Sequence, residues 1–135
     1  MNERDWEILK RAAAEVRSNA YAPYSHFAVG AALRTASGLT FPGCNVENAS
    51  FGATLCAERA AMAAAVAAGE HTLVGLAIVS SAERPTPPCG ICRQCLAELA
   101  PELPIRSYTE RAEAHYSLDT LLPEAFDRSQ LDRFG

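Results

Sequence analysis

Two short motifs contain the residues best suited to chemistry. Cys56-Ala57-Glu58 opens a run rich in alanine, and Pro88-Cys89-Gly90-Ile91-Cys92 follows further along the chain. A C-x-x-C step spans about one helical turn, so both of its thiols can reach one ion. Cys56 can supply a third sulfur from the neighbouring helix. Zinc takes four ligands, and three protein ligands leave one position for water, which is typical of catalytic zinc.

Both motifs are expected at helix N-termini, where unpaired N–H groups and the positive end of the helix dipole favour thiolate over thiol. Three thiolates on a dication leave a net negative centre, which weakens the metal as an acid toward its water. Arg59 is expected to offset this negative charge, because a guanidinium that donates to ligand sulfurs withdraws charge from the metal. Glu58 is expected to move protons rather than bind the metal.

Other interpretations of the cysteines stay open. A thioredoxin-like redox pair follows a strand and needs no upstream Cys-Ala-Glu. A structural zinc site needs a fourth ligand, and no unligated carboxylate such as Glu58. Cys95, three residues after Cys92, is the nearest candidate for that ligand, whereas Cys44 and the three histidines match no ligand spacing. We therefore favour catalytic zinc, with Cys44 and Cys95 as small buried residues and the histidines on the surface or in loops.

Hydrophobic periodicity predicts the elements that position these motifs. Helix-period and strand-period segments alternate, which indicates an α/β layered fold with a mixed sheet of about five strands and helices on its faces. The predicted elements are a helix over 3–18, strands from 27 to the turn at 37–38 and over 39–45, a helix over 56–68, a strand over 73–80, a helix over 89–100, short strands over 105–108 and 114–117, and a helical turn over 118–122.

The composition is that of one globular domain, 1–135, with 49% hydrophobic and 21% charged residues. A net charge of -4 without any Lys/Arg run argues against a nucleic-acid partner. The N-terminus lacks a signal-peptide pattern, and the alanine-rich run over 60–68 is too short and too weakly apolar for a membrane span. We expect a cytoplasmic protein with no membrane partner, whose five cysteines are not paired as disulfides.

Five segments, taken in order, carry a family pattern: 21–33, 43–52, 56–59, 88–94 and 121–126. The second metal motif and the upstream Cys-Ala-Glu also match the Cys form of the zinc-deaminase signature. The chain thereby resembles the small, homotetrameric cytidine deaminases. That resemblance implies a three-layer α/β fold with a five-stranded mixed sheet, one zinc ion per chain and a homotetramer.

The resemblance also implies roles in substrate binding. Phe27 would lie against the pyrimidine ring, Asn45 and Glu47 would hydrogen-bond the ribose 3′-hydroxyl, and the backbone N–H of Ala57 would hold the base carbonyl. An aromatic face suits a planar base, and an amide with a carboxylate can grip a hydroxyl as donor and acceptor. Without the resemblance, Phe27 would be a core residue and Asn45 and Glu47 would be turn residues.

The resemblance implies further roles for Phe126, Arg93 and Gln94. Phe126 would cross a subunit boundary to close a neighbour's pocket, and Arg93 and Gln94 would support the thiolates and the loop around them. Two departures from the family pattern are Phe51, where many members have Tyr, and Cys95, which replaces a more usual aliphatic residue.

The expected reaction is hydrolytic deamination of cytidine and 2′-deoxycytidine to uridine and 2′-deoxyuridine, with release of ammonia, as in pyrimidine salvage. Zinc lowers the pKa of its water toward neutrality, and Glu58 carries protons from that water to ring atom N3 and then to the amino group. The alternative is a deaminase of another small aminated heterocycle, such as blasticidin S or a modified cytosine nucleoside. The segment 45–48 and Phe126 favour a ribose-bearing pyrimidine, and the acidic balance disfavours a polynucleotide-editing deaminase.

Overall fold

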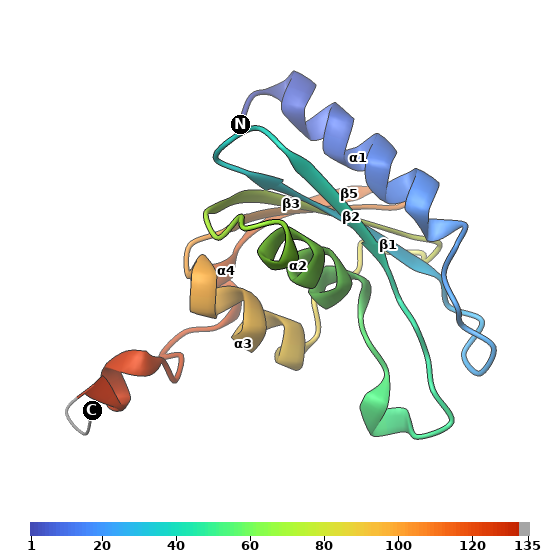
Figure 1. Cartoon of the computed structure of the whole chain (residues 1–135). Helices are drawn as coiled ribbons and strands as arrows, with labels where there is room; N and C mark the ends of the chain where they lie inside the picture. Colours follow the sequence, from blue (N-terminus) through green and yellow to red (C-terminus); the bar gives the residue numbers. More distant parts are fainter. Residues whose placement is uncertain (133–135) are drawn as a thin grey trace.

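A computed structural model describes residues 1–132, so the predicted domain 1–135 ends outside the described part. Its five strands form one sheet in the order β2-β1-β3-β4-β5, with β3 and β4 parallel and the other pairs antiparallel (Figure 1). The elements are α1 (Glu3–Arg17), β1 (Val29–Thr35), β2 (Thr40–Cys44), η1 (Phe51–Ala53), α2 (Ala57–Ala67), β3 (Leu73–Ser80), α3 (Gly90–Leu99), β4 (Pro104–Tyr108), β5 (Glu113–Ser117), α4 (Leu118–Leu121) and η2 (Arg128–Gln130).

Helix α1 covers one face of the sheet (Figure 1). It begins with a capping box in which the Asp5 N–H donates to Asn2 Oδ1 at 2.8 Å and the Asn2 N–H donates to Asp5 Oδ2 at 3.0 Å. The apolar stripe of α1 packs on the strand residues that point toward this helix, and together they form the smaller of two hydrophobic cores. That core consists of Trp6, Leu9, Ala13, Ala32, Ala77 and Tyr108.

Helices α2, α3 and α4 cover the opposite face, where the larger core lies (Figure 1). Alternate residues of β1, namely Val29, Ala31 and Leu33, point into this core, as the period of two predicts. Gly43 on β2 allows α2 to approach closely, because a Cβ there would lie 2.4 Å from the Ala61 nitrogen. The α2 N-terminus is therefore fixed tightly against the sheet.

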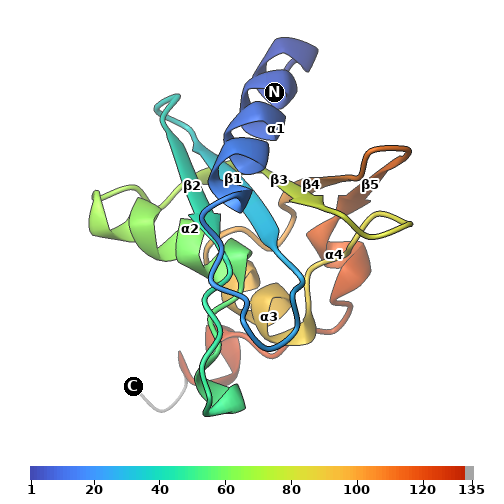
Figure 2. The ribbon, with the colours of Figure 1, turned by 90° about the vertical axis from the view of Figure 1, so that its right-hand side faces the viewer.

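Two connections, α1–β1 and β2–α2, extend together beyond the start of β1 and the end of β2, as the second view shows (Figure 2). The segment after α1 pairs with the segment after β2 through the bridge Tyr21–Val46, and Val46 also pairs with Leu55 just before α2. Residues predicted to bind substrate, including Phe27 and Glu47, lie in these segments. Their mutual pairing brings distant parts of the sequence next to the start of α2.

The predicted three-layer α/β fold with a five-stranded mixed sheet is confirmed, but three details were wrong. β1 begins at Val29 rather than 27, because the backbone of Phe27 bonds to side chains instead of a neighbouring strand. Cys44 and Cys95 are half-buried rather than buried. The two short helical turns, η1 and η2, were not among the predicted elements. Among residues 1–132, no helix has the length and apolarity needed to cross a bilayer.

Candidate metal centre and active site

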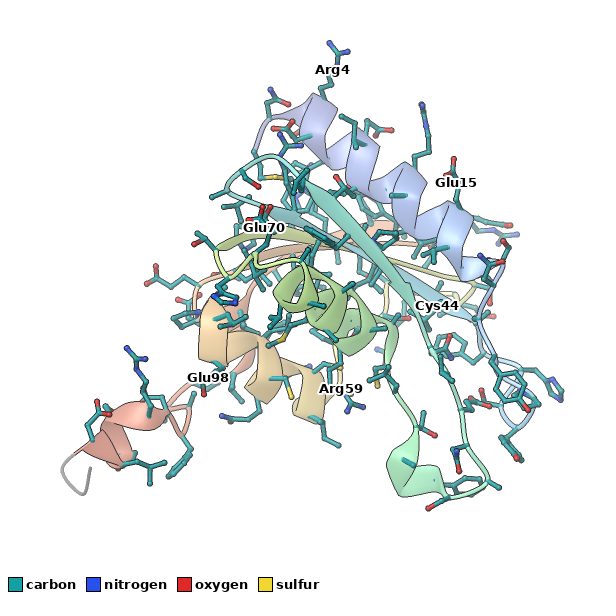
Figure 3. All side chains as sticks on the ribbon, viewed as in Figure 1. Arg4, Glu15, Cys44, Arg59, Glu70 and Glu98 are labelled. Carbon is teal, nitrogen blue, oxygen red and sulfur yellow. The ribbon has the colours of Figure 1, made fainter. Side chains whose placement is uncertain are left out.

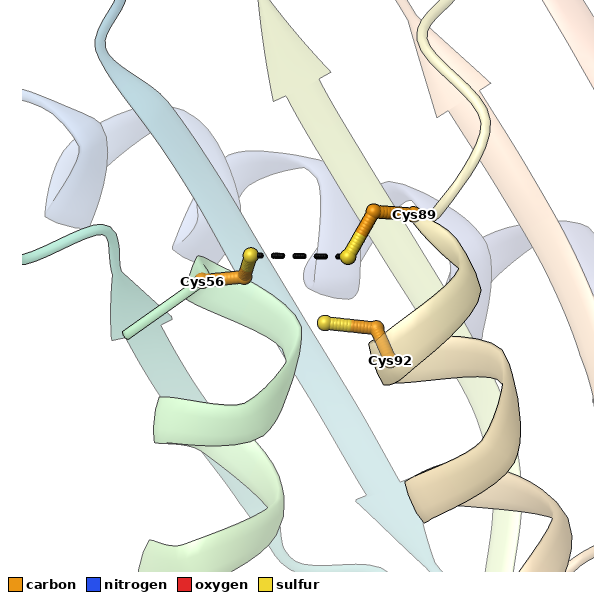
Figure 4. Close-up of side chains that lie close together, drawn as sticks. All are labelled: Cys56, Cys89 and Cys92. Atoms are coloured by element: carbon orange, nitrogen blue, oxygen red, sulfur yellow. Dashed lines mark hydrogen bonds between the residues drawn. The ribbon is translucent and has the colours of Figure 1, made fainter. Parts of the chain in front are cut away.

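The three metal-motif cysteines converge between the N-termini of two helices. Cys56 is the N-cap of α2 and Cys89 is the N-cap of α3, while Cys92 lies in the first turn of α3. Their Sγ atoms all lie within 4.8 Å of one another and point toward a common centre (Figure 4). Both helix dipoles thus present their positive ends to the sulfurs, which favours bound anionic thiolates.

The sulfur cluster fits a zinc ion. Cys56 Sγ and Cys89 Sγ are 3.6 Å apart. Tetrahedral zinc with Zn–S bonds near 2.3 Å requires an S–S separation of about 3.8 Å. Cys92 is buried, Cys56 is half-buried and Cys89 is exposed, so one side of the cluster opens to the surface. Three sulfurs and an open side correspond to a catalytic zinc site, in which the fourth position is reserved for water or substrate.

Cys95 does not join this cluster. Among residues 1–132, the group of potential metal ligands at this place contains three cysteines only. The reason is that the sulfurs meet beyond the N-terminus of α3, whereas Cys95 lies one turn further into the helix. All five cysteines are free, as expected. His26, His71 and His115 are exposed, which confirms their predicted surface positions.

Without metal, the thiols share protons unequally. The pKa of Cys56 is lowered to about 5, chiefly by a hydrogen bond from Cys92 and further by Arg59 and Cys89. The pKa of Cys92 is raised, chiefly because its proton is held in that bond to Cys56, and also by burial. Cys56 is therefore a thiolate near neutral pH before any ion binds.

Glu58 lies in the first turn of α2 beside the sulfurs. The residue is 5% exposed, and burial raises the pKa of its carboxyl to about 7, against an ordinary 4.5. Hydrogen bonds with its own backbone N–H and with Cys92 partly oppose that rise. A carboxyl with a pKa near neutrality can both accept and release a proton at physiological pH, which is the property that general acid–base catalysis needs.

Arg59 contacts the cluster from the neighbouring position on α2. Its Nη2 donates to the Thr54 carbonyl at 3.0 Å and to Cys56 Sγ at 3.7 Å. Hydrogen bonds to Cys56 and Cys92 raise the pKa of the guanidinium further, so it stays cationic. Three thiolates and a zinc dication carry a net charge of about −1, which one guanidinium offsets. The structure thus brings Arg59 to the sulfurs, where the sequence predicted it.

The predicted sugar and base contacts lie together in the paired loops. The Asn45 side chain accepts from the Val29 N–H at 2.9 Å and donates to the Phe27 carbonyl at 2.8 Å. The Glu47 carboxylate accepts from the Tyr24 N–H at 3.0 Å and from the backbone and side chain of Ser25. These bonds, led by the Ser25 hydroxyl, hold the pKa of Glu47 below its ordinary value. Both side chains therefore brace the loop that carries Phe27.

Two further predicted site residues are Ala57, at the start of α2, and Arg93, in the first half of α3. Ala57 is buried as the first residue of α2, where an N–H has no acceptor within the helix. Arg93 donates to the Pro88 carbonyl at 2.8 Å and to the Leu121 carbonyl at 2.9 Å. Through these hydrogen bonds Arg93 supports the loop before Cys89 rather than the sulfurs themselves.

Phe126 lies away from the sulfur cluster of its own chain. Its ring is 61% exposed, and Gln94 Nε2 donates to its carbonyl at 2.8 Å. Phe126 borders a cavity of about 280 Å³ together with Ala97, Glu98 and Pro101, at the C-terminal half of α3. The sulfurs meet at the opposite end of that helix, so the C-terminal segment projects from the body at a distance from them (Figures 1 and 3).

Comparisons with known proteins agree with this geometry. Residues 3–104 match the family model described as the cytidine and deoxycytidylate deaminase zinc-binding region. The chain belongs to that family. A cytidine deaminase of Mycobacterium tuberculosis is 41% identical over 138 residues, which cover 98% of each chain. One from Halalkalibacterium halodurans is 48% identical over 97 residues, covering 72% of this chain and 74% of that protein.

Solved structures of this family are also similar. The crystal structure of cytidine deaminase from Burkholderia pseudomallei superposes with a TM-score of 0.86 at 44% identity, covering 93% of this chain and all of that one. As a member of a zinc-binding deaminase family with a three-sulfur cluster of suitable geometry, the protein uses zinc as its cofactor. The family match and these relatives also show that the protein is a hydrolase that deaminates cytidine.

Sequence reasoning missed two residues of the deaminase loops. Ser25 bonds to Glu47 and to the Phe27 N–H, and the Tyr24 ring packs edge-on against Phe51 with centroids 5.9 Å apart. Phe51 is nonetheless 76% exposed. A serine two residues before an aromatic in a turn is a local signal for a side-chain-to-backbone bond. The partner carboxylate, more than twenty residues away, has no such local signal.

Proposed function

We propose that this zinc-dependent deaminase hydrolyses both cytidine and 2′-deoxycytidine, giving uridine and 2′-deoxyuridine with release of ammonia, at the centre formed by its three converging cysteines and Glu58. The observation that carries the proposal is a buried carboxyl, Glu58, beside three converging thiols that leave an open side. Membership of the deaminase family and the cytidine deaminases among its relatives support the choice of substrate. An aminated heterocycle such as blasticidin S is the less favoured substrate.

Cys56, Cys89 and Cys92 would hold the zinc ion, which when bound lowers the pKa of a water toward neutrality. Glu58 accepts a proton from the attacking water and delivers it to N3 of the pyrimidine. Once the C4–O bond has formed, the Glu58 carboxylate takes the proton of the new C4 hydroxyl and passes it to the amino group. The C4–N bond then breaks, ammonia leaves and C4 keeps the carbonyl oxygen of uridine. One buried carboxyl thus acts first as base and then as acid. Arg59 offsets part of the negative charge of the thiolates, which would otherwise weaken zinc as an acid toward its water.

Recognition of the nucleoside would use the paired loops. Phe27 packs against the pyrimidine ring, and the N–H of Ala57 donates to the base carbonyl. Asn45 retains an amide hydrogen beyond its bond to Phe27, because a side-chain amide has two donors. That hydrogen and the Glu47 carboxylate bind the ribose 3′-hydroxyl as donor and acceptor. Arg93 supports the loop that ends at Cys89.

We further propose that the chain acts as a single domain and assembles as a homotetramer in the cytoplasm, where it serves pyrimidine salvage. Phe126 is exposed and lies beside the C-terminal half of α3, whereas the sulfurs meet at the start of that helix, which supports a role at the site of a neighbouring subunit; Gln94 holds the backbone of that segment. A net charge of -4 and the absence of a membrane-spanning helix among residues 1–132 suit a small-molecule substrate rather than nucleic acid or lipid.

The direct test combines metal analysis with a spectrophotometric assay. Purified protein should contain about one zinc per chain, and cytidine should lose its characteristic ultraviolet absorbance as uridine and ammonia form. Blasticidin S, tested in parallel, should react far more slowly. A zinc-loaded protein that leaves cytidine unchanged and deaminates the other heterocycle would refute the proposed substrate.

A further inference from the structure

The hydroxyl of Ser25 connects two parts of the nucleoside site. Ser25 Oγ donates its proton to Glu47 Oε2 and accepts the Phe27 N–H at 3.0 Å. A hydroxyl has one proton and two acceptor lone pairs, so it can form both bonds at the same time. One oxygen atom thus joins the carboxylate proposed for the sugar to the aromatic residue proposed for the base.

The backbone between these residues needs such support. His26 has a φ of 58°, in the left-handed region that costs non-glycine residues free energy. Its N–H donates to the Ala22 carbonyl at 2.9 Å, which closes the turn. Phe27 follows directly, so any relaxation of His26 toward an ordinary backbone conformation would change where the Phe27 ring points.

The Glu47 carboxylate is oriented from the same turn. Oε1 accepts from the Tyr24 N–H at 3.0 Å and the Ser25 N–H at 3.1 Å, which leaves Oε2 dependent on the Ser25 hydroxyl. Terminal carboxylate torsions are broad, so a carboxylate bound through one oxygen only can rotate. The serine bond therefore decides how the second oxygen is presented.

We propose that Ser25 is a positioning residue for nucleoside recognition, which fixes Glu47 for the sugar 3′-hydroxyl and Phe27 for the base as one unit. This inference rests on the proposed function of the site. Ser25 itself needs no contact with the substrate. Its removal should weaken binding of nucleosides that carry a 3′-hydroxyl more than binding of nucleosides that lack one.

The test compares two substrates that differ in that hydroxyl, 2′-deoxycytidine and 2′,3′-dideoxycytidine. Ser25→Ala should lower kcat/KM for 2′-deoxycytidine about tenfold, mainly through KM, because a hydrogen bond to a charged group is lost. The loss with 2′,3′-dideoxycytidine should be about threefold or less, since only the support of Phe27 remains to be removed. Zinc content should stay unchanged, and Ser25→Thr, which keeps the hydroxyl, should restore the wild-type ratio of the two substrates.

Ser37, in the β1–β2 turn, provides a matched control, because its hydroxyl donates at 2.6 Å to the carboxylate of Glu70, which follows α2. Both residues lie outside the site. Ser37→Ala should leave both substrates unaffected. In a Glu47→Gln background, Ser25→Ala should add little further loss for 2′-deoxycytidine. Equal losses of Ser25→Ala for both substrates, or the same loss with and without the Glu47 carboxylate, would overturn the proposal.

Calorimetric titration with the products separates this proposal from the proposed function. The ratio of Kd values for 2′-deoxyuridine and 2′,3′-dideoxyuridine measures 3′-hydroxyl recognition without turnover. Failure of the zinc-loaded wild type to deaminate would refute the proposed function. A Kd ratio that Ser25→Ala leaves unchanged would overturn the Ser25 proposal, whatever the turnover.

Discussion

Replacing Glu58 by glutamine tests the chemistry most directly. Glutamine keeps the shape of the side chain but cannot carry a proton, so turnover should fall by about 10²- to 10⁴-fold. Zinc per chain should stay near that of the wild type, because the metal ligands are untouched. The measurements are metal analysis and the decrease in cytidine absorbance. A variant that binds zinc and deaminates at a near-normal rate would refute the role of Glu58.

The same substitution should stabilise the zinc-free protein at neutral pH. Burial raises the Glu58 pKa from 4.5 to about 7, so ionising it in the folded state costs about 3 kcal/mol. Below pH 4.5 the carboxyl is protonated in both states and costs nothing. As pH rises from 4.5 to 7, the unfolded state loses its proton first, and stability falls until the full cost applies above pH 7.

Urea unfolding of the zinc-free proteins measures this effect as a difference between variants. Glu58→Gln should exceed the wild type by about 1 kcal/mol at pH 5 and by about 3 kcal/mol at pH 8. Glu102→Gln, which changes an exposed carboxyl, is the matched control and should give no difference at either pH. A gain for Glu58→Gln that is independent of pH would mean that ionisation of the carboxyl is not its source.

Three further substitutions test the surroundings of the cluster. Arg59→Met removes the cation that offsets the thiolates, so zinc affinity in chelator competition should fall about 10- to 100-fold, and Arg59→Lys should recover part of it. Cys89→Ala should reduce bound zinc from one per chain toward none, whereas Cys95→Ala should leave the zinc content unchanged; zinc loss in Cys95→Ala would revive a fourth protein ligand. Gly43→Ala would place a Cβ 2.4 Å from the α2 backbone and should lower the free energy of unfolding by about 2 kcal/mol in urea, while Gly52→Ala, with open space around it, should be neutral. Equal stabilities of these two alanine variants would show that α2 does not depend on close approach to β2.

Local pattern was sufficient for the helices that carry the metal ligands. Alanine-rich sequence and Gly69 predict α2 almost to the residue, because alanine favours the helix and Gly69 ends it with a φ of 83°. The placement of Cys56 and Cys89 at helix starts followed from the same boundaries. The proposed ligand set could be inferred before any coordinates because the C-x-x-C step and Cys56 each fall at a predicted helix start; that the sulfurs converge is known only from the structure.

Long-range side-chain bonds were beyond that pattern. Alternation extends the first strand back to Phe27, whose side chain does pack on the core. Its carbonyl, however, bonds to Asn45, which lies eighteen residues further along the chain, and its N–H bonds to Ser25. Competition of side chains for backbone groups ends a strand without changing its hydrophobic period. The loop geometry of the substrate site is for this reason invisible to periodicity.

Phe126 shows a different limit, because its surroundings depend on more than one chain. The motif in the sequence identifies the residue, but in a single chain Phe126 is 61% exposed and lies beside the C-terminal half of α3, whereas the sulfurs meet at the start of that helix. Exposing a large aromatic side chain costs free energy that burial against another surface would recover. Glu58 and the cysteines are complete within one chain, whereas the proposed closure of the nucleoside pocket is not. In the proposed tetramer, each chain would therefore supply its own metal ligands and proton carrier, whereas closing its nucleoside pocket would require Phe126 of a neighbouring chain.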